Sequence, residues 1–211
     1  MKTYKHSHTL AIGITGGIGR GKTEAAKIFQ RLGGQVLFAD DIARDVVNSN
    51  QTVKRKIQNV FGRNTYKDGL LDRKKMALIA FHNQKSRKKL DGIVHPHVLK
   101  FIKDEIVKAK SSRKKSLIFV EAALIFEAHA ERLFDYIVVV TANKQKSIER
   151  VMKRDNATQK EVLRRIGSQM ATSDKVARAD FILENDGSKA LLERNCRFLF
   201  ELLLSLTQKN D

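Results

Sequence analysis

The chain has 211 residues, of which 42% are hydrophobic, so it can bury the core of one α/β domain with a small inserted lobe. Its formal net charge of +18 favours anionic partners such as nucleic acids or polyphosphates, although a solvated lysine-rich surface gives the same balance. The single cysteine, Cys196, excludes an intrachain disulfide and fits a reducing compartment.

The apolar stretches are too short for membrane insertion. Leu117–Phe126 is the most apolar segment, but Glu121 interrupts it, and a helix that spans a bilayer needs about 20 apolar residues. The run Thr9–Ile14 is too short for the apolar region of a signal peptide. We therefore expect a cytoplasmic protein with no membrane partner.

Short apolar runs alternate with helical patterns along most of the chain. Strands are expected over residues 10–14, 35–39, 117–120, 136–140 and 181–183, and helices over 22–32, 42–47, 144–155 and 191–206. Thr158 and Glu161 have the spacing of a capping box for one more helix, which runs through Met170. This alternation predicts a three-layer α/β/α fold with a five-stranded parallel sheet.

The region between Val46 and Lys110 is helical without alternating strands, which predicts a lobe beside the sheet. Asp72 is a candidate N-cap of one helix. Pro96 is expected in the first turn of the next, where its missing N–H costs nothing. That helix should run towards Ala109 and end in a basic loop. The whole chain, 1–211, is thus expected to form a single domain.

The segment from Gly16 to Thr23 fits the pattern G-x-x-x-x-G-K-[ST] between an expected strand and an expected helix. Glycines let a backbone curl around an anion, and a helix N-terminus adds free N–H groups and the positive end of its dipole. Lys22 would reach the β- and γ-phosphates, and the Thr23 hydroxyl would ligate Mg²⁺. Nucleotide binding is assigned to Gly16, Gly17, Gly19, Arg20, Gly21, Lys22, Thr23 and Glu24.

The remaining sequence argues against other nucleotide-binding classes. A GTPase would show N-K-x-D and D-x-x-G, but Asn143-Lys144 is followed by Gln145-Lys146, and no D-x-x-G occurs. The chain is also short for a motor or transporter ATPase. A small-metabolite kinase remains, and such an enzyme needs a carboxylate near the acceptor hydroxyl and arginines that close over the phosphates.

Asp40 is the candidate catalytic carboxylate, because it follows the second expected strand, and ligands bind at the carboxyl ends of parallel strands. It could instead cap the following helix, although the neighbouring Asp41 is the better cap. Arg150 and Arg154 lie four residues apart, hence on one face of a basic helix. They are candidates for a phosphate-binding lid, with a solvated basic face as the alternative.

Several further short motifs follow the phosphate-binding segment. They are Ala39-Asp40 with Ile42-Ala43-Arg44, Leu71-Asp72-Arg73, Val94-His95-Pro96, Leu124-Ile125-Phe126-Glu127, Arg150 with Arg154-Asp155, Ile166 and Gln169, Ala179-Asp180-Phe181-Ile182, and Asn185-Asp186-Gly187-Ser188. In their order and spacing, and with Ile14–Thr23, they resemble bacterial dephospho-CoA kinases over nearly the whole chain. No later motif is specific alone.

The resemblance implies a P-loop kinase fold and transfer of the ATP γ-phosphoryl to the 3′-hydroxyl of dephospho-CoA, the final step of coenzyme A synthesis. It implies an acceptor-binding lobe over about residues 46–112, with Arg44 and His95 near the acceptor, and a lid over about 144–172. Asp40 would be the base-like carboxylate. Asn185 and Gly187 would lie near the adenine, and Arg150 or Arg154 would close over the phosphates.

Three residues depart from the family pattern. Phe38 replaces the first aspartate of D-A-D, and activity would be altered if that carboxylate helps to hold metal or acceptor. Ala123 stands where proline is usual. Glu121 stands near the family's aspartate at a strand end and could order Mg²⁺-bound water, although it could simply cap the strand. His95 likewise could cap a helix.

Two other functions are compatible with the sequence. A P-loop kinase for another nucleotide-like acceptor differs only in the lobe, and a nucleic-acid-dependent ATPase would use the positive charge. The basic clusters Lys85–Lys89 and Lys110–Lys115 lack interleaved aromatic residues, and no nucleic-acid-binding module is recognisable, so no nucleic acid partner is expected. A monomer and a small homo-oligomer are both compatible with the sequence.

Overall fold

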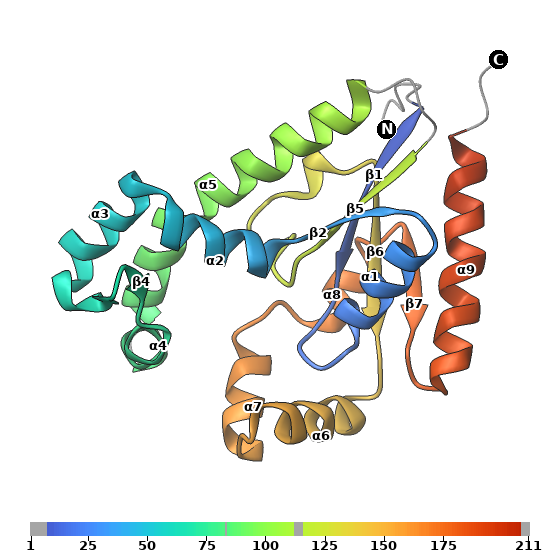
Figure 1. Cartoon of the computed structure of the whole chain (residues 1–211). Helices are drawn as coiled ribbons and strands as arrows, with labels where there is room; N and C mark the ends of the chain where they lie inside the picture. The colour runs from blue at the N-terminus through green and yellow to red at the C-terminus, as the bar shows by residue number, and fades with distance from the viewer. Residues whose placement is uncertain (1–7, 83, 112–115, 208–211) are drawn as a thin grey trace. The chain divides into compact units, whose positions relative to one another are not determined.

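The computed structural model describes residues 8–82, 84–111 and 116–207. The chain divides into two compact units, Met1–Leu37 with Glu105–Asp211, and Phe38–Asp104 (Figure 1). We call them the sheet unit and the helical unit. The predicted acceptor lobe, about residues 46–112, coincides largely with the helical unit.

The sheet unit contains a five-stranded sheet of order β2-β5-β1-β6-β7. The strands are β1 (Thr9–Thr15), β2 (Gln35–Phe38), β5 (Ser116–Glu121), β6 (Tyr136–Thr141) and β7 (Phe181–Glu184). β1 pairs in parallel with β5 and β6, and β6 pairs in parallel with β7. All five predicted strands are confirmed, because strands buried on both faces stand out as apolar runs.

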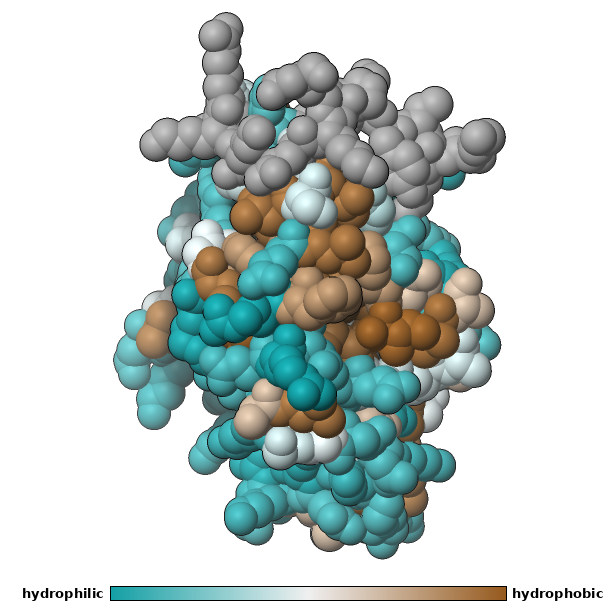
Figure 2. All heavy atoms as spheres, turned by 90° about the vertical axis from the view of Figure 1, so that its right-hand side faces the viewer, coloured by the Kyte–Doolittle hydropathy of each residue, from teal (hydrophilic) through white to brown (hydrophobic). Residues whose placement is uncertain are grey.

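Two helices cover one face of this sheet, α1 (Lys22–Arg31) and α9 (Lys189–Leu206). The rings of Phe29 in α1 and Phe119 in β5 stack with centroids 4.4 Å apart, and Phe200 of α9 stacks on both. The outer side of α9 keeps Phe198 69% exposed, and Figure 2 shows apolar side chains gathered on this side of the molecule.

The opposite face of the sheet is covered by the chain after β5 and by the end of a long helix. Gly13 of β1 lies against Ile125 and Phe134, which leave no room for a Cβ. The Thr9 hydroxyl donates a hydrogen bond to the carbonyl of Ala109. Helices thus lie on both sides of the parallel sheet, as the predicted three-layer fold requires.

Three helices follow β6 in the predicted lid region, α6 (Lys144–Asp155), α7 (Gln159–Gly167) and α8 (Thr172–Val176). The capping box of Thr158 and Glu161 is confirmed at the start of α7, in both of its reciprocal hydrogen bonds. Ile148 and Val151 of α6 pack against Val162 of α7, and Ile18 of the loop after β1 packs against this cluster.

The helical unit consists of α2 (Ala39–Ser49), α3 (Gln51–Phe61), a 3-10 turn (Arg63–Thr65), α4 (Arg73–His82) and most of α5 (Gln84–Ser111). It also contains a two-stranded hairpin that the sequence analysis missed, β3 (Tyr66–Lys67) with β4 (Leu70–Leu71). Its turn is Asp68-Gly69, with φ angles of 50° and 83°. An Asp-Gly pair is a known hairpin signal, but two-residue strands are too short to show alternation.

The hairpin is held to α2 by two hydrogen bonds. The Tyr66 hydroxyl donates to the carbonyl of Val47, and the Asn48 side chain accepts the N–H of Leu71. The predicted N-cap Asp72 is confirmed, because its Oδ1 accepts the N–H of Lys75 at 3.0 Å.

Two predictions about helix starts in this unit are wrong. Pro96 lies inside the 28-residue α5, because the buried residues Val94, Val98 and Ile102 give the helix a continuous apolar side across the one missing N–H. Neither Asp40 nor Asp41 is an N-cap, since α2 begins at Ala39 and Phe38 holds the cap position.

The helix α5 ends at Ser111, just beyond Ala109 and inside the basic segment Lys110–Lys115 in which its end was expected, and residues 112–115 lie outside the described residues. Within the described ranges, no helix combines the length and the apolar character needed to cross a membrane.

Candidate active site

The loop between β1 and α1 has a backbone conformation that favours glycine at two positions, where the surroundings also leave no room for a Cβ. Gly19 and Gly21 have φ angles of 75° and 94°. A Cβ on Gly19 would stand 2.4 Å from the carbonyl oxygen of Ser147, and one on Gly21 would stand 2.1 Å from Nδ2 of Asn185. The loop is therefore closed in by α6 on one side and by the segment after β7 on the other.

The first residues of α1 complete this loop. Since the N-cap residue is Gly21, the N–H groups of the first turn have no capping side chain, and they are available to an anion. Lys22 is 9% exposed, and its Nζ donates to the carbonyl of Gly17 at 3.2 Å, so its ammonium lies across the loop. Thr23 and Glu24 are exposed.

The segment after β7 is tied to the loop by Asn185. The side-chain Nδ2 group of Asn185 donates to the backbone carbonyl of Arg20 at 3.0 Å. The backbone carbonyl of Asn185 accepts a hydrogen bond from Nη2 of Arg150 at 3.2 Å. Burial lowers the pKa of Arg20, against the attraction of Asp186. The structure thus brings together Arg20, Arg150 and Asn185, three of the predicted site residues.

The two predicted lid arginines bind different partners. Arg150 reaches Asn185, whereas Arg154 makes two hydrogen bonds to Asp155, from Nε at 2.7 Å and from Nη2 at 3.1 Å. Arg165 of α7 donates to the same carboxylate at 2.7 Å. These bonds, above all that from Arg154, hold the pKa of Asp155 below its usual value. The sequence analysis missed Arg165, although it lies in the basic last turn of α7.

Glu121 lies at the carboxyl end of β5, paired in register with Ile14, and it is 7% exposed. Alternation along β5 places it on the same sheet face as Phe119, the face that α1 covers. Among the described residues, no cluster of three His, Cys, Asp or Glu side chains could hold a metal. Mg²⁺ in kinase sites is held by one or two protein oxygens with phosphates and water, so Glu121 and Thr23 are donors of a suitable kind.

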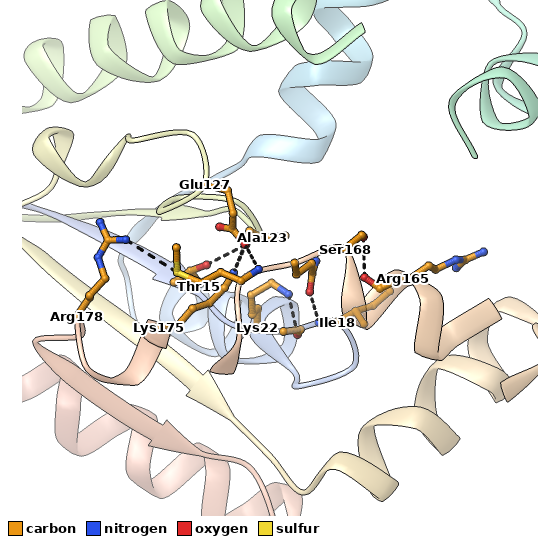
Figure 3. Close-up of polar contacts among 12 residues, drawn as sticks. Thr15, Ile18, Lys22, Ala123, Glu127, Arg165, Ser168, Lys175 and Arg178 are labelled. Carbon is orange, nitrogen blue, oxygen red and sulfur yellow. Dashed lines mark hydrogen bonds and ion pairs between the residues drawn. The ribbon is translucent and has the colours of Figure 1, made fainter. Parts of the chain in front are cut away.

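An ion pair that the sequence analysis missed lies beside this loop. The ammonium of Lys175 in α8 is 2.9 Å from Oε1 of Glu127 and donates to the carbonyl of Ala123 at 2.8 Å. Figure 3 shows Lys175, Thr15 and Glu127 converging near Ala123. No local pattern marks Lys175, because its partners lie far away in the sequence.

Three predicted site residues belong to the helical unit. Asp40 is exposed in the first turn of α2, and Arg44 on the same helix forms an ion pair with Asp41 at 3.1 Å. His95 lies inside α5, with Nε2 3.7 Å from Oδ1 of Asp91, so it does not cap a helix. Their catalytic and acceptor-binding roles stay predictions.

The family model described as dephospho-CoA kinase matches residues 10–190. A dephospho-CoA kinase of Bacillus cereus is 38% identical over 85% of this chain and 90% of its own length, and one of Latilactobacillus sakei is 32% identical over 92% and 95%.

Several solved structures have a similar fold. A dephospho-CoA kinase from Campylobacter jejuni has a TM-score of 0.71 at 28% identity and covers 93% of this chain and 98% of its own. A crystal structure from Thermus thermophilus has a TM-score of 0.77 at 31% identity, with 94% and 99% covered. A shikimate kinase from Acinetobacter baumannii shares the fold, with a TM-score of 0.51 at 15% identity, over 94% of each chain.

Proposed function

The chain belongs to the dephospho-CoA kinase family and is an ATP-dependent kinase, and from this premise we propose how its own residues carry out the reaction. The reaction is transfer of the γ-phosphoryl of ATP to the 3′-hydroxyl of dephospho-CoA, the last step of coenzyme A synthesis, in the cytoplasm. The observation that carries the proposal is the glycine loop, with the uncapped N-terminus of α1 and the ammonium of Lys22 lying across it.

The loop binds the phosphates of ATP through its backbone. N–H groups of the loop and of the first turn of α1 donate to phosphate oxygens, and Lys22 exchanges the Gly17 carbonyl for the β- and γ-phosphates. Bound Mg²⁺ would supply positive charge that offsets the charge of the phosphates. The Thr23 hydroxyl would be one of its ligands, and Glu121 would hold a water molecule of its shell.

Asp40 accepts the proton of the 3′-hydroxyl. The hydroxyl oxygen forms a bond to the γ-phosphorus while the bond from that phosphorus to the bridging oxygen breaks, and ADP leaves with the electron pair. Because Phe38 occupies the place of the family's other aspartate, Asp40 would act without a neighbouring carboxylate at position 38. Arg44 and His95 would contact the acceptor.

The lid arginines stabilise charge on the transferred group. Arg154 and Arg165 are both held by Asp155, and a guanidinium fork binds phosphate as readily as carboxylate. When ATP is bound, either arginine can exchange Asp155 for phosphate. Arg150 would instead position Asn185 and Gly187 beside the adenine.

The proposal is tested by ADP release with ATP, Mg²⁺ and dephospho-CoA, and by the mass of the product. Adenosine, AMP and a DNA oligomer serve as parallel acceptors or activators. We expect ADP release that depends on dephospho-CoA and a product heavier by one phosphoryl group. If the folded, ATP-binding protein phosphorylates AMP or adenosine instead, the assignment of dephospho-CoA as the acceptor is wrong. If DNA stimulates ATP hydrolysis, the protein is a nucleic-acid-dependent ATPase and not a kinase.

The variant Lys22→Ala tests whether the loop contributes to catalysis. We expect the fold to survive, with an unchanged circular dichroism spectrum, while kcat/KM falls by at least about 100-fold, because a charge aimed at the transferred phosphoryl group is lost. Near-normal turnover in this variant would remove the loop from the mechanism.

A further inference from the structure

Lys175 is a fully buried lysine, with 0% of its surface exposed. Lysines are almost never fully buried unless they are paired, because the ammonium loses its hydration. Here the ammonium has two partners, Oε1 of Glu127 at 2.9 Å and the carbonyl oxygen of Ala123 at 2.8 Å. Neither partner nor Lys175 belongs to the proposed set of substrate-binding residues.

The two partners connect Lys175 to the phosphate-binding loop from the sheet side. The carbonyl of Ala123 also accepts the hydroxyl of Thr15 at 3.2 Å, and Thr15 is the last residue of β1, directly before the loop. The Lys175 ammonium and the Thr15 hydroxyl therefore donate to the same acceptor, the carbonyl of Ala123, at the point where the loop begins (Figure 3).

A second connection runs through the segment between α7 and α8. Oε1 of Glu127 also accepts the N–H of Met170 at 2.9 Å, and the neighbouring Gln169 accepts the N–H of Ile18 in the loop at 3.1 Å. A Cβ on Gly17 would stand 3.8 Å from the Thr172 hydroxyl. The segment 169–172 thus lies directly against the phosphate-binding loop.

Glu127 carries a negative charge in this network. Burial alone raises the pKa of its carboxyl group, but the hydrogen bonds from Lys175 and from the Met170 N–H prevail, so the pKa lies below its usual value. A buried ion pair is weak evidence for stability, because the lost hydration offsets the attraction, and apolar residues of similar volume often serve as well. What the ion pair supplies is a fixed geometry, since Nζ of Lys175 also binds the carbonyl of Ala123, and Oε1 of Glu127 also binds the N–H of Met170.

We propose that Lys175 is a positioning residue for phosphoryl transfer, which fixes the segment 169–172 at the base of the lid against the phosphate-binding loop. It acts through Glu127 and Ala123 and does not touch the substrates. This inference rests on the proposed role of the loop in binding ATP. It assigns a fixed point of the lid to the segment that leads from α7 into α8.

The test compares three variants of the full-length protein. Lys175→Met leaves the Glu127 carboxylate buried without its cation, so we expect a strong loss of thermal stability. The double variant Lys175→Met with Glu127→Gln removes both charges but keeps an acceptor for the Met170 N–H. We expect it to recover a Tm within about 3 °C of the wild type while kcat stays at least about tenfold lower.

Lys110→Met with Asp135→Asn is the matched control. It removes another lysine–carboxylate pair of the sheet unit, in which the carboxylate likewise accepts a backbone N–H, that of Ala11, but neither residue has a hydrogen bond to the loop or to the segment 169–172 among the described contacts. We expect kcat within about twofold of the wild type.

The outcomes separate a positioning role from a structural one. Recovery of both Tm and kcat in the double variant would show that the pair only stabilises the fold, and would overturn the proposal. A lowered kcat with restored Tm supports it. If Lys22→Ala retained activity, the proposed role of the loop would fail first, independently of the Lys175 variants.

Discussion

Single residues in this protein are constrained mainly by what surrounds them. Gly21 has a backbone conformation that costs other residues energy, and it also touches Asn185. Gly33 has a similar φ of 100°, but nothing lies within 4 Å of the position of its Cβ. A side chain at position 33 would therefore cause backbone strain alone, whereas one at position 21 would cause both strain and a steric clash.

We predict that Gly21→Ala weakens ATP binding, whereas Gly33→Ala does not. Both variants should lose about 1–3 kcal/mol in the free energy of unfolding, because alanine is strained at positive φ. Only the methyl group at position 21 would displace Asn185 from the loop. Urea denaturation and calorimetric ATP titration measure the two effects, and equal ATP affinities in both variants would contradict the assignment of Asn185.

Phe38 is the residue whose departure from the family pattern bears most directly on activity. We predict that Phe38→Asp raises kcat if the missing carboxylate limits the reaction, because a second carboxylate beside Asp40 could help to hold metal or acceptor. The measurement is ADP release at saturating ATP and dephospho-CoA, with Phe38→Asn as the uncharged control. Equal rates for all three proteins would show that the aromatic residue is tolerated.

At the scale of elements, charged hydrogen bonds hold the turn between α6 and α7. Asp155 ends α6 and binds Arg154 of the same helix and Arg165 of the next. The capping box at Thr158 then fixes the start of α7. The relative placement of the two helices therefore depends on one carboxylate as well as on the apolar contacts of Ile148, Val151 and Val162.

We predict that the stabilising effect of Asp155 is lost in acid. The folded state lowers the pKa of Asp155, so its contribution is present above the unfolded value of about 3.9 and disappears as the pH falls through the lower, folded value. The Tm of Asp155→Asn should therefore lie below that of the wild type at pH 6, and the difference should narrow towards pH 3. A constant difference would show that the charge of Asp155 is not involved.

For the whole molecule, the formal charge of +18 matches a reaction between two polyanions. We predict that the KM values for ATP and dephospho-CoA rise as salt is raised from about 50 to about 300 mM, because screening weakens long-range attraction, whereas kcat changes little. Steady-state kinetics in potassium chloride measures both. KM values that do not depend on salt would indicate that the charge serves only solubility.

The sequence by itself determined the features that depend on neighbouring residues. The apolar runs predicted the five strands, the glycine-lysine motif predicted the glycine-rich loop between β1 and α1, and Thr158 with Glu161 predicted the capping box, because hydrogen bonds within one turn and the alternation of side chains are local. Asp72 is a further example, since an N-cap acts on the N–H three residues later.

Tertiary structure decided the features in which distant segments compete for the same groups. The sequence placed Arg150 and Arg154 on one face, but only the fold shows that Asp155 holds Arg154 together with Arg165, while Arg150 reaches Asn185. It likewise could not show that Lys175 is buried against Glu127, or that α5 continues through Pro96. The energy of a buried charge, or of a helix with one hydrogen bond missing, depends on the surfaces packed around it, and these exist only once the chain has folded.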